Sequence, residues 1–193
     1  MKIAVFGGSF NPIHTGHAII ASTTAQSGLV DEVWIMVSPQ NPLKADKTLM
    51  PEEERFRLVS MVASECPGVK ASDFEFTLPR PSYTYNTLCR LRERWPEHEF
   101  TLLIGSDNWN LFDRWRDWKR IIDEFGVIIY QRPDAKADPP FPERVELLGD
   151  VPMMMVSSSL IRRLMAEGKD FRFLVPDIIY KELKEKEEWK KIN

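Results

Sequence analysis

Short apolar runs alternate with segments of helical spacing along this chain, and this alternation limits the fold more than any other feature of the sequence. Most of the runs are hydrophobic almost without interruption, as expected of strands buried inside a parallel sheet. We predict strands at residues 2–7, 32–38, 69–76, 100–105, 126–131 and 151–157. We predict helices at residues 16–28, 51–66, 84–95, 115–124, 158–168 and 178–191. Strands that alternate with helices predict right-handed βαβ units, and hence an α/β fold with a parallel sheet.

The same pattern indicates where a ligand would bind. In open parallel sheets, ligands bind beyond the carboxyl ends of the strands. The connections that leave those ends are residues 7–17, 38–50, 105–115, 131–140 and 156–162. A further irregular stretch, residues 132–143, is rich in proline and acidic residues, and we expect a surface loop there without an assigned role.

Composition limits the class of protein. The chain has 193 residues, enough for one domain with a substantial core, and at 43% hydrophobic and 28% charged residues it is typical of globular proteins. The net charge is −3, with both signs interspersed, which argues against a broad surface for nucleic acid. Anion binding is therefore expected only at a few placed residues.

The cysteines and the N-terminus favour a cytoplasmic protein. Cys66 and Cys89 are the two cysteines, too few for a disulfide scaffold, and we expect both to be reduced. The N-terminal residues lack the long apolar core of a signal peptide and already fit a strand. No apolar run is long enough for a membrane span, so we expect no membrane association.

The stretch GGSFNPIHTGH, residues 7–17, follows the first predicted strand and opens a helix. A tight polar connection would explain it without any ligand. It lacks the spacing of the dinucleotide fingerprint and of the P-loop, and His14 and His17 lack the spacing of the helical zinc motif. A phosphate site fits better, because glycines admit a close phosphate, the helix N-terminus attracts anions, and both imidazoles can donate hydrogen bonds. The sequence does not decide which histidine is protonated.

A second anion-binding pattern lies near the other end of the chain. Residues 156–163, VSSSLIRR, open a helix with hydroxyl groups at Ser157 and Ser158 and with the forked cation of Arg162. An N-cap with a surface arginine is the simpler alternative. Two such helix starts at one edge of the sheet could together bind a triphosphate. They would then hold its pyrophosphate part as it leaves.

These motifs resemble those of a known family. GGSFNPIHTGH resembles the H-x-G-H motif of the nucleotidyltransferase superfamily, and its full form resembles bacterial nicotinate mononucleotide adenylyltransferases. VSSSLIRR is similar to the family pattern I-S-S-T-x-I-R, with Val156 and Ser159 as mild departures. The resemblance runs from Gly7 to Arg162 with its motifs in family order. It implies a Rossmann-like parallel sheet with helices on both faces, in a single nucleotidyltransferase domain over residues 1–193 whose C-terminal helices, about 157–190, pack on the same sheet.

The resemblance also assigns residues to the nucleotide. Lys44 is equally compatible with solvent or ligand on its own, but the matching family lysine faces the phosphates. Asp107 follows the fourth predicted strand, where it could accept ribose hydroxyls or cap a helix, and the family assigns this G-x-D to adenosine. The implied phosphate-handling residues are His14, His17, Lys44 and Arg162. The implied ATP-binding residues are Gly7, Gly8, Ser9, Phe10, Gly105, Asp107, Arg132, Ser157 and Ser158.

Two further motifs narrow the acceptor. PSYTYNTL, residues 81–88, resembles the S-Y-T motif, in which Thr84 would hold the pyridine carboxylate; without the resemblance, Thr84 would be a helix-cap residue. FDRWRDWKR, residues 112–120, places Trp115 where the family stacks an aromatic ring on nicotinate. Trp115 and Trp118 would otherwise fit a core stripe, and for Trp118 we expect the core.

The implied reaction is adenylyl transfer from ATP to nicotinate mononucleotide in NAD biosynthesis, which yields nicotinate adenine dinucleotide and pyrophosphate. Mg²⁺ is expected to be bound mainly through the ATP phosphates, without a dedicated set of protein ligands. The alternatives are the same chemistry on nicotinamide mononucleotide or another phosphate acceptor, and a nucleotide sensor without turnover. A homo-oligomer is left open.

Overall fold

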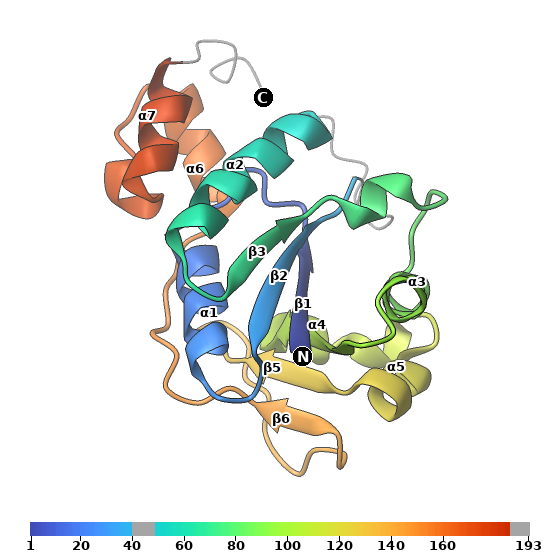
Figure 1. Cartoon of the computed structure of the whole chain (residues 1–193). Helices are drawn as coiled ribbons and strands as arrows, with labels where there is room; N and C mark the ends of the chain where they lie inside the picture. The colour runs from blue at the N-terminus through green and yellow to red at the C-terminus, as the bar shows by residue number, and fades with distance from the viewer. Residues whose placement is uncertain (40–48, 186–193) are drawn as a thin grey trace.

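The computed structural model describes residues 1–39 and 49–185, and in them the predicted parallel sheet is confirmed. The six strands lie in the order β3-β2-β1-β4-β5-β6, and every neighbouring pair is parallel (Figure 1). Their bounds are β1 Lys2–Gly8, β2 Glu32–Val37, β3 Val69–Ser72, β4 Glu99–Gly105, β5 Val127–Tyr130 and β6 Val145–Leu147.

Helices cover both faces of this sheet, as expected (Figure 1). One face packs against α1 (Thr15–Gln26), α2 (Glu52–Glu65), α6 (Ser158–Ala166) and α7 (Asp177–Glu185). The other face packs against α3 (Thr84–Arg94) and α5 (Trp118–Phe125). Short helical turns lie between these elements: η1 (Phe74–Thr77), α4 (Ser106–Trp109), η2 (Phe112–Arg114) and η3 (Arg172–Leu174). The C-terminal helices thus share one core with the sheet, within the described residues.

The strand order reverses between β1 and β4, and this reversal positions the site. β1 pairs with β2 on one side and with β4 on the other, and the chain crosses to opposite faces of the sheet after these strands. The loops that leave β1 and β4 therefore diverge and open a crevice at the carboxyl edge, where α/β sheets bind ligands.

The predicted strand at 151–157 is wrong. The sheet position beside β5 is taken by β6, while residues 151–157 form neither a strand nor a helix. Pro152 has no amide hydrogen to donate to a sheet. Met153 and Met155 are 63% and 81% exposed, whereas Val156 is buried, so only part of the apolar run lies in the core.

Several predicted element bounds also change. The third strand stops at Ser72, and Phe74–Thr77 forms a 3-10 turn that directs Glu75 into the interior. The helix predicted from Trp115 begins at Trp118, after Asp117 in the left-handed region at φ 58°. α1 and α6 end before Gly28 and Gly168, which adopt φ values of 78° and 66°, so both glycines terminate their helices as predicted.

None of the helices in the described part of the chain is long and apolar enough to cross a membrane.

Candidate active site

The start of α1 is built by its two histidines. His14 is the N-cap, and its Nδ1 atom accepts the backbone N–H of His17 at 3.4 Å. In return, the Nδ1 atom of His17 accepts the backbone N–H of His14 at 3.3 Å. The rings stack with centroids 3.6 Å apart and planes 19° from parallel. This is a capping box in which imidazoles replace the usual hydroxyl and carboxylate.

The capping box fixes the tautomer of both rings. Each Nδ1 atom accepts a hydrogen bond, so the ring hydrogen of the neutral imidazole is on Nε2. Burial lowers the pKa of His14 to about 4, with a further contribution from the positive charge of Arg132. Burial also holds the pKa of His17 well below its ordinary value, helped by His14 and Arg132. Without a ligand, the two histidines are neutral donors at neutral pH.

The glycines of this loop leave space in different ways. A Cβ at Gly7 would meet nothing within 4 Å, so the backbone there is open to a ligand. A Cβ at Gly8 would lie 3.1 Å from the ring of Phe10, and one at Gly16 would lie 3.2 Å from the ring of His14. Phe10 is 2% exposed and packs edge-on against His17 at 4.9 Å between ring centroids. The ring of Phe10 therefore supports His17 from the core.

The second motif lies directly against the first. Ser157 caps α6 by accepting the N–H of Leu160, which is the simpler alternative that the sequence left open for this residue. Ser158 Oγ donates to the carbonyl of Pro12 at 2.8 Å. Arg162 Nη1 donates to the carbonyl of Asn11 at 2.8 Å. Residues about 150 positions apart in sequence thus form one surface, which we call the phosphate side: His14, His17, Ser158 and Arg162.

Sequence reasoning missed Arg55, which holds the loops of the phosphate side together. Its guanidinium is fully buried in α2 and donates to the carbonyls of Ser9 (2.7 Å), Ser38 (2.8 Å), Pro39 (3.0 Å) and Met50 (2.9 Å). The loops that follow β1 and β2 are therefore joined through one side chain. An arginine at a core position of the α2 helical pattern was the available signal, because buried arginines require dedicated partners.

Gly105, Asp107 and Arg132 come together at the carboxyl ends of β4 and β5. Arg132 Nε lies 3.7 Å from Asp107 Oδ1, and neither atom has a hydrogen-bond partner among the described residues. A Cβ at Gly105 would collide with Asp107 and lie 3.0 Å from the ring of Tyr130. Burial raises the pKa of Tyr130 to about 12, with the charge of Asp107 contributing. This group offers one carboxylate and one guanidinium with unused hydrogen-bonding atoms.

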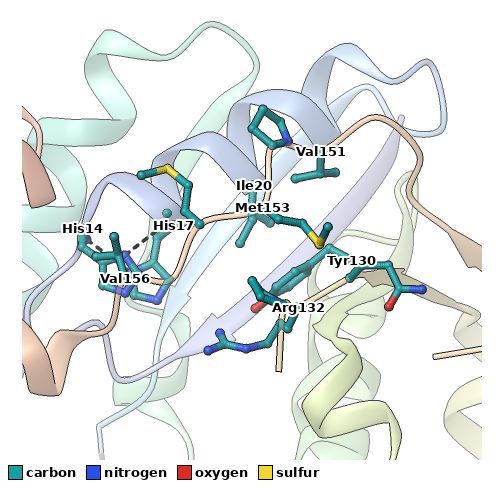
Figure 2. A pocket seen from close by; sticks show the side chains of 13 residues that line it. His14, His17, Ile20, Tyr130, Arg132, Val151, Met153 and Val156 are labelled. Atoms are coloured by element: carbon teal, nitrogen blue, oxygen red, sulfur yellow. Dashed lines mark hydrogen bonds between the residues drawn. The ribbon is translucent and has the colours of Figure 1, made fainter. Parts of the chain in front are cut away.

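A pocket lies between the two histidines and the side chains of Tyr130 and Arg132. Figure 2 shows His14 and His17 on one side of it and Tyr130 and Arg132 on the other. The unpaired segment 151–156 contributes most of the remaining wall. The residues that were incorrectly predicted as a strand therefore line the pocket.

Thr84 and Trp115 lie on the other face of the sheet, and we call their surroundings the acceptor side. Thr84 begins α3 and Trp115 ends the η2 turn, and both are half-buried. Their neighbours meet, because the guanidinium of Arg116 lies 4.9 Å from the ring centroid of Tyr83. The two predicted acceptor motifs are thus adjacent. Lys44 lies outside the described residues.

Glu75 was also missed by sequence reasoning. It is 8% exposed and accepts hydrogen bonds from Thr87 Oγ1 at 2.9 Å and from Ser82 at 3.4 Å. Burial raises the pKa of Glu75, while the hydroxyls of Ser38, Thr87 and Ser82 oppose that change. Glu75 joins the end of β2 to the start of α3. Its position in a predicted strand concealed this role.

The fold and the two joined helix starts are those of a nucleotidyltransferase. The chain belongs to the cytidylyltransferase-like family, which it matches over residues 5–164, and within it to the nicotinate-nucleotide adenylyltransferases.

Two curated relatives support this assignment, and one solved structure shares the fold. The chain is 45% identical over 183 residues to a Bacteroides fragilis protein named "Probable nicotinate-nucleotide adenylyltransferase", covering 94% of this chain and 90% of the relative. It is 41% identical over 175 residues to a Cytophaga hutchinsonii protein of the same name, covering 91% of each. The fold matches Plasmodium falciparum nicotinic acid mononucleotide adenylyltransferase complexed with NaAD, with a TM-score of 0.77, 19% identity and 93% coverage of each chain.

Proposed function

We propose that this protein transfers the adenylyl group of ATP to the phosphate of nicotinate mononucleotide, giving nicotinate adenine dinucleotide and pyrophosphate in NAD biosynthesis. Membership of the family supports the reaction class. The observation that carries the proposal is the hydrogen bond of Arg162 to the carbonyl of Asn11, which joins the two anion-binding helix starts into one surface. That surface presents two imidazoles, a guanidinium and two helix N-termini to one ligand.

The chemistry needs no protein nucleophile. An oxygen of the acceptor phosphate forms a bond to the α-phosphorus of ATP, and the bond from that phosphorus to the bridging oxygen of the β-phosphate breaks. Pyrophosphate leaves with the bonding electrons. The protein's contribution is to align the two phosphates and to stabilise the charge that develops on the oxygens.

The two histidines suit that contribution. Their Nδ1 atoms are occupied by the capping box, so their Nε2–H groups are the donors available to the α-phosphate. We assign both histidines to the phosphates of ATP, with His17 at the reacting α-phosphate. Burial and Arg132 lower the pKa of both rings, and a bound triphosphate acts in the opposite direction.

Arg162 and Lys44 would hold the pyrophosphate part of ATP, with Ser157 and Ser158 at the α6 start. Gly7, Gly8, Ser9 and Phe10 would contribute the loop backbone beneath the phosphates, since Gly7 leaves that backbone open. Asp107 would accept ribose hydroxyls, Gly105 would contribute to the ATP site by leaving room for Asp107, and Arg132 would line the adenine side. Asp107 Oδ1 and Arg132 Nε have no hydrogen-bond partner among the described residues, and this supports the placement of adenosine beside them.

We propose that Mg²⁺ enters with ATP and is held mainly by its phosphates. Among the described residues, no three histidine, cysteine or acidic side chains are grouped to hold a metal ion. The phosphate oxygens would be the main ligands, and the ion would neutralise charge on the leaving pyrophosphate.

On the acceptor side, we propose that Trp115 stacks on the pyridine ring and that Thr84 donates to its carboxylate. Backbone N–H groups near Trp115 would share that carboxylate. Preference for nicotinate over nicotinamide then depends on these donors, because the amide presents its own NH₂ donor where the carboxylate presents an acceptor. We further propose that the enzyme works in the cytoplasm on these small substrates.

One assay tests the function: pyrophosphate release from ATP with Mg²⁺ and each acceptor offered in turn. We expect release with nicotinate mononucleotide to exceed release with nicotinamide mononucleotide or phosphopantetheine. Equal release with the nicotinamide nucleotide would contradict the acceptor assignment. Tight ATP binding without release for any acceptor would support a sensor without turnover and overturn the enzyme proposal.

A further inference from the structure

The proline-rich loop of residues 132–143 is fastened to the protein at several points. Asn110 Nδ2, just beyond α4, donates to the carbonyl of Lys136 at 3.1 Å. The side chain of Gln131 bonds both backbone groups of Ala137, at 2.7 and 3.0 Å. Ala137 is 2% exposed and belongs to the core on the acceptor side. The loop is therefore built into that side of the molecule.

A chain of aromatic rings connects this loop to Trp115. Phe141, in the loop, meets Trp109 edge-on, with ring centroids 6.0 Å apart and planes at 79°. Trp109 stacks on Phe112 at 5.4 Å and 24°. Phe112 lies against Trp115 at 5.2 Å and 49°. Each contact is within the range in which aromatic pairs attract beyond simple burial.

We propose that Phe141 and Trp109 are positioning residues for the acceptor: through Phe112 they set the orientation of Trp115, and loop 132–143 thereby determines how tightly a pyridine nucleotide is held. The proposal rests on the proposed function and deepens it, since it assigns the part of the loop around Phe141 to the acceptor, whereas Arg132 at the start of the loop stays with ATP.

The placement of Trp115 explains why such support is needed. Trp115 has the extended backbone angles φ −76° and ψ 144°, and it lies between the η2 turn and α5. Its backbone N–H bonds the carbonyl of Phe112 at 2.9 Å, which fixes the main chain but not the indole. A half-buried indole without a fixed neighbour would lose rotamer freedom upon stacking, and that loss weakens binding.

Phe112 itself cannot substitute for the outer rings. It is 2% exposed, so its ring is confined by its neighbours, and Trp109 covers one of its faces. Removal of Phe141 would leave the edge of Trp109 unsupported and let Trp109 and Phe112 rotate. Trp115 would then sample orientations that do not match the pyridine plane.

The test replaces Phe141 with alanine and separates the two substrates. We expect Phe141→Ala to raise the KM for nicotinate mononucleotide about fivefold, the effect of one lost aromatic contact, with the KM for ATP unchanged. Calorimetric titration with nicotinate mononucleotide alone should show the same loss of affinity. Phe141→Tyr keeps the ring edge and should restore wild-type values. Phe173→Ala is the matched control, because Phe173 is 87% exposed and lies outside this chain of rings.

The outcomes distinguish this proposal from the proposed function. If Trp115→Ala weakens nicotinate mononucleotide while Phe141→Ala leaves its affinity unchanged, the positioning proposal is overturned and the function stands. Equal weakening of both substrates by Phe141→Ala would mean a general structural role and would also overturn it. If the wild-type protein neither binds nor adenylylates nicotinate mononucleotide, the proposed function fails and this proposal fails with it.

Discussion

Hydrogen bonds join the two helix starts of the phosphate side, whereas ring contacts support the indole of Trp115 on the acceptor side. On the phosphate side, His14 and His17 cap one helix reciprocally, and Arg162 and Ser158 bond the loop in front of it. On the acceptor side, Trp115 lies against Phe112 at the end of a row of aromatic rings. Hydrogen bonds fix direction within narrow limits, while ring contacts tolerate rotation. The phosphate chemistry is thus assigned to the phosphate side, whose geometry is fixed by hydrogen bonds. The choice of acceptor is assigned to the acceptor side, where the packing of rings can adjust.

The largest expected effect is on the phosphate side. His17→Ala removes an Nε2–H donor aimed at the α-phosphate, and we expect turnover to fall by at least about 100-fold, the low end for a lost electrostatic stabiliser. Steady-state release of pyrophosphate measures it. His98→Ala is the control, because His98 lies directly before β4, at the amino ends of the strands and away from the site. Near-normal turnover of the His17 variant would show that His17 does not stabilise the reacting phosphate.

The second prediction concerns stability. Arg55→Met leaves four backbone carbonyls, all at least partly buried, without their donor, and we expect a loss of about 3 kcal/mol in the free energy of unfolding. Arg55→Lys should not restore it, because one ammonium cannot reach four carbonyls in a fork geometry.

Urea denaturation measures this loss. Arg57→Met, in the same helix, is the control, since its ion pairs with Glu54 and Glu182 are partly exposed and worth little. A loss no greater than that of the control would show that the loops of the phosphate side hold together without Arg55.

The third prediction concerns the acceptor side. Trp115→Ala should raise the KM for nicotinate mononucleotide about tenfold, because a stacked ring and its buried area are lost, and should leave the KM for ATP nearly unchanged. Initial rates with each substrate varied in turn measure both constants. Trp118→Ala, the same change three residues further on, is the control. Equal effects on both substrates would show that the two sides are not separate.

The two sides also differed in how far the sequence predicted them. His14, His17, Ser157 and Arg162 could be placed because helix starts after strands have recognisable residues, and a parallel sheet brings their edges together. The structure confirms that these helix starts meet. The contacts that hold them there, above all those of Arg55, depend on which carbonyls the loops leave unpaired, and no local pattern records that.

The remaining errors have physical reasons. Residues 151–157 are hydrophobic, but β6 already occupies the edge beside β5, so their side chains line a pocket and meet solvent. Glu75 was hidden in a predicted strand because its burial depends on distant hydroxyls at Ser38 and Thr87. Long-range partners decided both cases, and periodicity reports only local geometry.

The smallest expected effect is a pH dependence of folding stability, which we expect from the phosphate side and not from the acceptor side. The pKa of His14 is lowered to about 4 in the folded protein and is near 6.5 in the unfolded chain, so between these values the unfolded chain binds the extra proton. Stability from this group is present above about pH 6.5 and is lost as the pH falls. From about pH 7 to about pH 5.5, we expect the wild type to lose about 1 kcal/mol more unfolding free energy than His14→Asn, in which asparagine keeps an N-cap without titrating.

Urea denaturation at both pH values measures the difference, with Trp115→Ala as an acceptor-side control that should follow the wild type. An equal loss in His14→Asn would mean that the histidine pair is not buried in its neutral form.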